Sequence, residues 1–147
     1  MIKKFIEAWD ENKGNLEEYL KSHNQSEYSS YEKLLALLFD VVINPYLRGE
    51  GNFPVTYDEV EYCTDKIHVI DDGDYQGTQI FIIPKDSYQP CSYDYVWTCH
   101  DYGSCSGCDL LLSISDYGGE LPSDEQVKRY MKLELNLLQN LNYLKNL

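Results

Sequence analysis

The chain has 147 residues, of which 43% are hydrophobic, and it carries a formal net charge of −13. This length is enough to bury the core of one domain, so we expect a single domain over residues 1–147. No apolar run approaches the ~20 residues that cross a bilayer, and no apolar signal segment opens the chain, which predicts a cytoplasmic protein that does not bind membranes. The negative charge argues against direct binding of nucleic acid.

The negative charge is concentrated in the middle of the sequence. Residues 1–49 carry 8 acidic and 6 basic side chains, a sum of −2, and residues 127–147 carry 1 acidic and 4 basic, a sum of +3. Residues 50–126 carry 16 acidic and 2 basic side chains, a sum of −14, and the three sums together restore −13. Such a segment attracts a basic partner surface and speeds encounter with it. Net charge also keeps a protein soluble, and that simpler interpretation stays open.

Two amphipathic helices are predicted in the first third of the chain. The first has apolar residues at the i, i+3, i+4, i+7 spacing of a helix face, over residues 2–9. Gly14 is expected to interrupt or end it, because glycine is a poor helix former. The second helix is predicted over residues 31–42, with Asn44 and Pro45 as its stop signal, since the residue before a proline avoids helical angles.

From about Thr56 the apolar period changes from 3.6 to 2, which indicates strands. Residues 66–70 and 78–83 have strand patterns and are separated by a turn rich in aspartate and glycine, so we predict a hairpin over residues 66–83. A third strand is predicted over residues 93–99, because its residues alternate in character. One face of that strand carries four residues: Tyr93, Tyr95, Trp97 and Cys99.

The last third of the chain shows two helix-start signals. Residues 106–109 match the S-x-x-D form of a capping box, and the apolar run that follows predicts a short helix, with a fourth strand as the competing prediction. Residues 123–126 form a second capping box before a long terminal helix. The sequence therefore predicts an α+β fold, in which a small antiparallel meander is covered by two N-terminal helices and a long C-terminal helix.

Four of the five cysteines lie between residues 91 and 108, and two of them form a C-x-x-C pair, Cys105 and Cys108. Such a pair supplies two of the four ligands that zinc requires. The remaining ligands would be Cys99 or His100 together with a hairpin residue such as His68, because Cys99 and His100 point to opposite faces if the strand continues through them. A second C-x-x-C is absent from the sequence. We therefore expect a protein without a cofactor, and a bound zinc ion is the alternative.

Two other interpretations of the C-x-x-C pair stay open. A thiol-disulfide site would need a low thiol pKa, and the neighbouring Asp101 and Asp109 oppose formation of a thiolate. Alternatively the segment is a tight turn, in which Gly103 and Gly107 permit unusual backbone angles and the cysteines simply pack. The sequence favours this third, structural interpretation.

The acidic middle of the chain also holds eight of the 14 tyrosines. Tyrosine is enriched at protein interfaces, and carboxylates beside it suit a basic protein surface. No hydrolase or phosphate-binding motif is present in the sequence, so a non-catalytic binding protein is favoured over an enzyme. The predicted binding surface consists of Asp71, Asp72, Asp74, Tyr75, Tyr93, Tyr95, Asp101 and Tyr102.

Three segments carry a resemblance to a known group of proteins: residues 70–84 (IDDGDYQGTQIFIIP), residues 102–109 (YGSCSGCD) and the helix from Gln126. They resemble a family of small proteins of uncharacterised activity that bacteriophages and prophages of Gram-positive bacteria encode. The resemblance implies a phage context, in the cytoplasm of a bacterial host, and supplies no catalytic role. Small acidic phage proteins often inhibit host or defence machinery, anti-CRISPR proteins among them. The resemblance therefore implies a host or defence protein as the partner.

Overall fold

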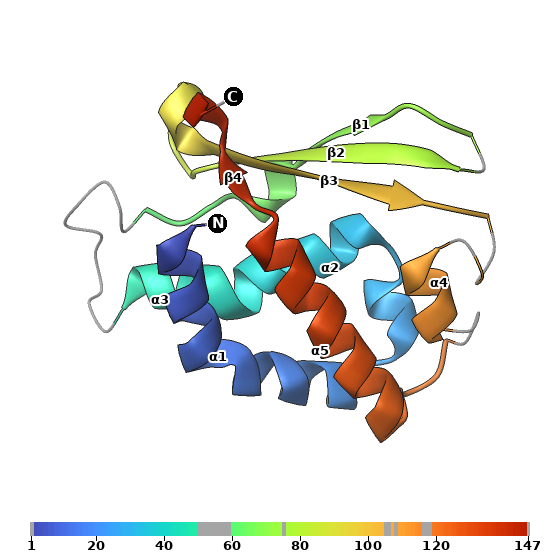
Figure 1. Ribbon diagram of the computed structural model, residues 1–147. Coiled ribbons are helices and arrows are strands. Elements are labelled where there is room, and N and C mark those ends of the chain that lie inside the picture. The colour runs from blue at the N-terminus through green and yellow to red at the C-terminus, as the bar shows by residue number, and fades with distance from the viewer. Residues whose placement is uncertain are drawn as a thin grey trace.

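The computed structural model describes residues 2–49, 60–74, 76–104, 107, 109–115 and 119–146. It has two layers: a four-stranded sheet forms one, and the helices α1, α2, α3, α4 and α5 lie on one side of it (Figure 1). The strands run in the order β1-β2-β3-β4 and all neighbours are antiparallel. The predicted α+β fold, with its meander and its covering helices, is confirmed.

Helix α1 (Lys3–Ser22) is continuous, so the prediction that Gly14 interrupts or ends it is wrong. Gly14 is exposed, and nothing approaches the position of its missing Cβ within 4 Å. A glycine in a helix interior costs about 1 kcal/mol relative to alanine. Burial of Trp9 before it and Leu16 after it outweighs that cost, because each large apolar side chain contributes about 1.5–3 kcal/mol on burial.

The helical segment that begins with α2 (Tyr31–Leu38) continues through Asn44 and Pro45, so the prediction that these two residues stop it is wrong. A π-helical turn, η2 (Phe39–Ile43), leads directly into α3 (Asn44–Arg48). Pro45 thereby falls in the first turn of α3, where proline is tolerated. The buried Asn44 side chain also donates to the carbonyl of Tyr62 at 2.9 Å and accepts from its N–H at 2.8 Å.

The sheet contains the predicted hairpin, as β1 (His68–Asp71) and β2 (Gly77–Pro84). Strand β3 (Tyr95–Tyr102) begins two residues later than predicted, because residues 92–94 form the 3-10 turn η5, and it continues three residues further. The short strand β4 (Asn142–Tyr143) follows the last long helix and pairs with β3. Sequence patterns did not predict β4, since two residues are too few to show a period.

The two C-terminal helices begin at residues with a side-chain cap. Helix α4 (Leu110–Ser115) confirms the predicted short helix over the competing strand. Its cap is Asp109, whose carboxylate accepts from the N–H of Leu112 at 3.3 Å. The predicted cap, Ser106, lies outside the described residues. Helix α5 (Asp124–Gln139) has the predicted capping box. There Ser123 accepts from the N–H of Gln126 at 3.2 Å, and the Gln126 side chain accepts from the N–H of Ser123 at 2.9 Å.

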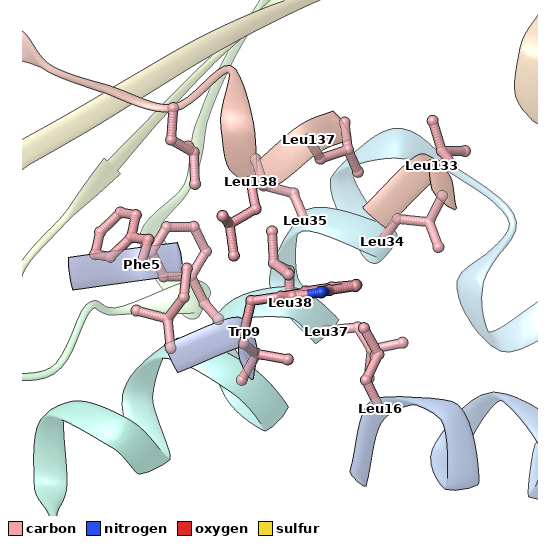
Figure 2. Packing of buried hydrophobic residues seen from close by; sticks show 14 of the residues in the cluster. Phe5, Trp9, Leu16, Leu34, Leu35, Leu37, Leu38, Leu133, Leu137 and Leu138 are labelled. Carbon is pink, nitrogen blue, oxygen red and sulfur yellow. The ribbon is translucent and has the colours of Figure 1, made fainter. Parts of the chain in front are cut away.

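The hydrophobic core lies between the helices and reaches the covered face of the sheet. Leucines of α2 and α5 interdigitate beside the aromatic side chains of α1 (Figure 2). The sheet adds the fully buried Phe81, Ile83 and Val96. No helix in the described part of the chain is long and apolar enough to cross a membrane. The residues labelled in the core view are Phe5, Trp9, Leu16, Leu34, Leu35, Leu37, Leu38, Leu133, Leu137 and Leu138.

Candidate binding surface

One face of the sheet is covered by helices and the other faces solvent (Figure 1). Burial alternates along the strands: Phe81 and Ile83 of β2 are buried, whereas Ile80 and Ile82 are only half-buried. In β3 the alternation separates the buried Val96 and Thr98 from the more exposed residues of the opposite face, as predicted. We call the solvent side of the sheet the open face. Its apolar residues are Ile70, Ile80, Ile82, Tyr95, Trp97 and Cys99.

The strand register places five of these side chains in two adjacent rows, and Tyr95 lies in the next row, opposite Pro84. Ile70 of β1 pairs with Ile80 of β2, which pairs with Cys99 of β3. In the next row Ile82 pairs with Trp97. Directly opposed residues of antiparallel strands lie about 4.5–5.5 Å apart at Cβ, so each row is in contact across the sheet. Ile70 is 52% exposed, and Ile80, Ile82 and Trp97 are half-buried, so the two rows present apolar side chains to solvent.

An acidic cluster borders the open face at the tip of the hairpin. Asp101 of β3 pairs with Thr78 of β2, and the Thr78 hydroxyl donates to its carboxylate at 2.7 Å. The carboxylate of Asp72 accepts from the Thr78 N–H at 2.6 Å. The turn requires glycine at Gly73, because a Cβ there would overlap the carbonyl of Gln76. We call Asp71, Asp72, Asp74 and Asp101, with Tyr102, the acidic tip. Asp101 lies on the open face, whereas Asp71 and Tyr102 lie on the same side of the strands as His100.

Asp71 is the most extensively hydrogen-bonded carboxylate of the acidic tip. It accepts from the Tyr102 hydroxyl at 2.5 Å, from the Gly73 N–H at 3.0 Å and from the Gln79 amide at 3.2 Å. These bonds, that of Tyr102 foremost, hold the pKa of Asp71 below its usual value. The same contact raises the pKa of Tyr102 to about 12. Asp71 is therefore ionised and held in one orientation at neutral pH.

The structure divides the predicted binding residues between the two ends of the sheet. The acidic tip gathers Asp71, Asp72, Asp74, Asp101 and Tyr102 at one end. Tyr95 lies on the open face at the start of β3, and Tyr93 lies in η5, 59% exposed, with the Lys145 ammonium 5.6 Å from its ring centroid. Both therefore belong to the opposite end. Tyr75 lies outside the described residues.

The residues of the metal prediction are only partly described. Cys99 is exposed on the open face, whereas His100 points to the helix side and stacks on Tyr31, with ring centroids 5.6 Å apart. Because β3 continues to Tyr102, these two candidate ligands lie on opposite faces. Burial also lowers the pKa of His100. Within the described ranges no group of three His, Cys, Asp or Glu side chains is placed to hold a metal ion.

The cysteines of the C-x-x-C pair, Cys105 and Cys108, lie outside the described residues. The neighbouring Asp109 is buried and structural. Its carboxylate accepts from the Tyr31 hydroxyl at 2.9 Å and from the N–H of Gly103 at 2.9 Å, in addition to capping α4. The Tyr31 hydroxyl accepts in turn from the N–H of Leu111 at 3.2 Å. This network attaches the end of β3 and the start of α4 to α2, and the sequence did not predict it.

Sequence reasoning also missed Ile70, Ile80 and Ile82 as surface residues. The apolar run Ile80–Ile83 has no alternation, so it does not show which side chains face solvent. The signal that could have identified them is the clear alternation of β3. The pairing of β3 with β2 then determines which side chains of β2 face solvent. Comparison of the chain with protein-family models, with curated proteins and with solved structures finds no match.

Proposed function

We propose that this chain is a non-catalytic protein-binding protein, which docks on a basic surface of a partner protein through its open face and acidic tip. The observation that carries the proposal is the apolar open face bordered at one end by the hydrogen-bonded carboxylates of Asp72 and Asp101. Protein interfaces combine an apolar, aromatic centre with a polar rim. Here Trp97, Ile80 and Ile82 supply the centre, and Asp72 and Asp101 supply part of the rim.

The two parts of the surface have different roles. Apolar area removed from water supplies affinity, about 25 cal/mol per Å². The carboxylates of the tip speed encounter with a positively charged partner and set its orientation. Because Asp72 and Asp101 are already hydrogen-bonded within the protein, little side-chain entropy is lost when a partner docks.

The proposed partner is a host or defence protein of a bacterial cell, met in the cytoplasm and inhibited or modulated by this chain. The resemblance of residues 70–84 and 102–109 to phage and prophage proteins supports this choice. The charge supports it independently, since a basic surface that normally holds nucleic acid attracts a chain of net charge −13. An anti-CRISPR role is one form of this proposal.

Affinity capture from a bacterial host lysate, repeated at rising salt, tests the proposal. The wild-type chain is compared with Trp97→Ser and with a triple variant that lowers the charge of the tip, D71N/D72N/D101N, in which each asparagine keeps one oxygen as an acceptor. The matched control is E11Q/E18Q, which removes two exposed charges of α1. We expect one set of captured proteins to be lost with both surface variants and kept by the control.

The salt series separates the two contributions. Capture by the wild-type chain should weaken as salt rises, because exposed charges are screened beyond about 8 Å at physiological ionic strength. Capture of nothing at low salt would refute the proposed function. Equal capture by Trp97→Ser would refute the role of the open face.

A zinc site at Cys105 and Cys108, or a thiol-disulfide reaction there, is the alternative proposal. Elemental analysis of protein purified without added metal decides the first, and titration of the two thiols decides the second. Stoichiometric zinc would favour a small metalloprotein, and a depressed thiol pKa would favour redox chemistry.

A further inference from the structure

A cavity of about 320 Å³ opens at the end of the sheet opposite the acidic tip. One wall of the cavity comes from the turn η4 (Thr64–Lys66) and the start of β1, and the other wall comes from the segment after β2. Its volume is at the lower limit of the cavities that bind small molecules. The apolar part of its wall comes from Ile67, Pro84 and Tyr95.

The charge that lines this cavity is opposite in sign to that of the chain. Residues 50–126 contain 16 carboxylates and only two lysines, Lys66 and Lys85, and both lysines line the cavity. His68 lines it as well, and Asp86 is the one carboxylate among the described lining residues. Lys66 and His68 are exposed, whereas Lys85 is 5% exposed. Folding has therefore brought the two positive charges of the acidic middle to one place.

The positive surface continues past Lys85. A neighbouring cavity of about 110 Å³ shares Lys85 and adds Lys4 and Lys145, with no carboxylate among its described lining residues. The Lys145 ammonium lies 5.3 Å from the ring centroid of Tyr143, and that of Lys85 lies 5.7 Å from the ring centroid of Tyr62. This end of the molecule thus combines ammonium groups with aromatic faces.

The walls of the larger cavity are held by backbone hydrogen bonds. The N–H of Cys63 donates to the carbonyl of Pro84 at 2.7 Å, and the N–H of Asp86 donates to the carbonyl of Glu61 at 2.8 Å. The N–H of Lys85 donates to the carbonyl of Asp94 at 2.6 Å. The segments that carry the basic side chains are therefore fixed before any ligand arrives, which lowers the entropic cost of binding.

We propose that this cavity binds a small organic anion, a carboxylate or phosphate ester that carries one flat apolar ring. Lys66 and His68 bind the charged head through charge-assisted hydrogen bonds. Ile67, Pro84 and Tyr95 cover the ring. The cavity adjoins the open face, with which it shares Tyr95, and lies at the end of the sheet opposite the acidic tip. The proposal does not depend on the proposed function.

Titration of ¹⁵N-labelled protein with phenyl phosphate, followed by NMR, tests the proposal. We expect saturable shifts at the amides of residues 66–68 and 85–86, with a Kd of about 1 mM or tighter, as a ligand of this size allows. Benzoate tests the carboxylate form of the ligand, inorganic phosphate tests the head alone, and phenol tests the ring alone. Both partial probes should bind at least about tenfold more weakly than phenyl phosphate.

The variant K66Q/H68Q should weaken phenyl phosphate binding by about tenfold or more, because it removes the two exposed head-group contacts. Both side chains are exposed, so the fold is expected to tolerate the change. Lys21→Gln is the matched control: it removes an exposed lysine of α1 that pairs with Glu17, and it should bind like wild type. Shifts that do not saturate, or equal binding by K66Q/H68Q, would overturn the proposal.

Discussion

Glu134 is a carboxylate buried in the core-facing side of α5. It has 0% exposure, and neither of its oxygens has a hydrogen-bond partner among the described residues. Burial raises its pKa well above the usual value, because an ionised carboxylate loses its hydration there. The hydroxyl one turn earlier on the same helix, that of Tyr130, donates to Gln25 at 2.7 Å and is thus engaged elsewhere.

The free energy of unfolding should therefore depend on pH through Glu134. The unfolded chain releases this proton near pH 4.5, whereas the folded chain keeps it to a higher pH. Stability from this group is complete below pH 4.5 and is lost as pH rises toward the pKa of the folded state, by about 1.4 kcal/mol for each pH unit. At pH 7, about 2.5 pH units above 4.5, the loss is at most about 3.4 kcal/mol.

Glu134→Gln keeps the shape of the side chain but does not titrate. It should be more stable than wild type at pH 7, by up to that amount, and the difference should shrink toward zero near pH 4.5. Glu134→Leu also removes the unsatisfied polar atoms, which should add about 1–3 kcal/mol of stability at both pH values.

Urea denaturation at pH 5 and pH 7 measures these differences. Glu18→Gln serves as the control, since Glu18 is exposed on α1 and its replacement should change stability by less than about 0.5 kcal/mol at either pH. The reasoning fails if Glu134→Gln differs from wild type equally at both pH values, or if it is the less stable protein at pH 7. Either result would mean that the ionised carboxylate is stabilised in the folded state.

Three further substitutions test local features of the structure. Tyr31→Phe leaves the buried carboxylate of Asp109 without one donor and should destabilise the protein by about 1–3 kcal/mol, as measured by urea denaturation. Ser123→Ala removes the cap of α5 and should lower the free energy of unfolding by about 1 kcal/mol in the same assay. Tyr102→Phe should raise the pKa of Asp71 toward its usual value, which an NMR titration of the carboxylate would detect, and an unchanged pKa would contradict the assigned hydrogen bond.

The sequence predicts those elements whose signals are local and strong. The hairpin of β1 and β2 is marked by a turn rich in aspartate and glycine, and the cap of α5 by a serine three residues before a glutamine. The predictions at Gly14 and Pro45 are wrong because both are local stop signals, and tertiary packing outweighed them. In α1 buried side chains lie on both sides of Gly14, and in α3 a π-helical turn moves Pro45 to a harmless position.

The candidate surface could be predicted only in part, for a different reason. Composition indicates that the middle of the chain is acidic and rich in tyrosine, but it gives no position in space. The aspartates of the hairpin turn meet Asp101 only through the register of β2 with β3, which pairs Thr78 with Asp101. Likewise Lys66 and Lys85 are 19 positions apart in sequence, and the cavity that they share exists only once the start of β1 lies beside the end of β2.

The two charged regions lie at opposite ends of the same strands, and their separation determines how they act. Strand β2 runs from Gly77 at the acidic tip to Pro84 at the cavity, and seven steps of about 3.3 Å give a distance of about 23 Å. This exceeds the screening length of about 8 Å at physiological ionic strength. A basic partner on the tip and an anion in the cavity therefore interact only weakly with one another in solution. At low salt, where screening reaches about 30 Å, each should strengthen the binding of the other, since the charges of the two ligands are opposite.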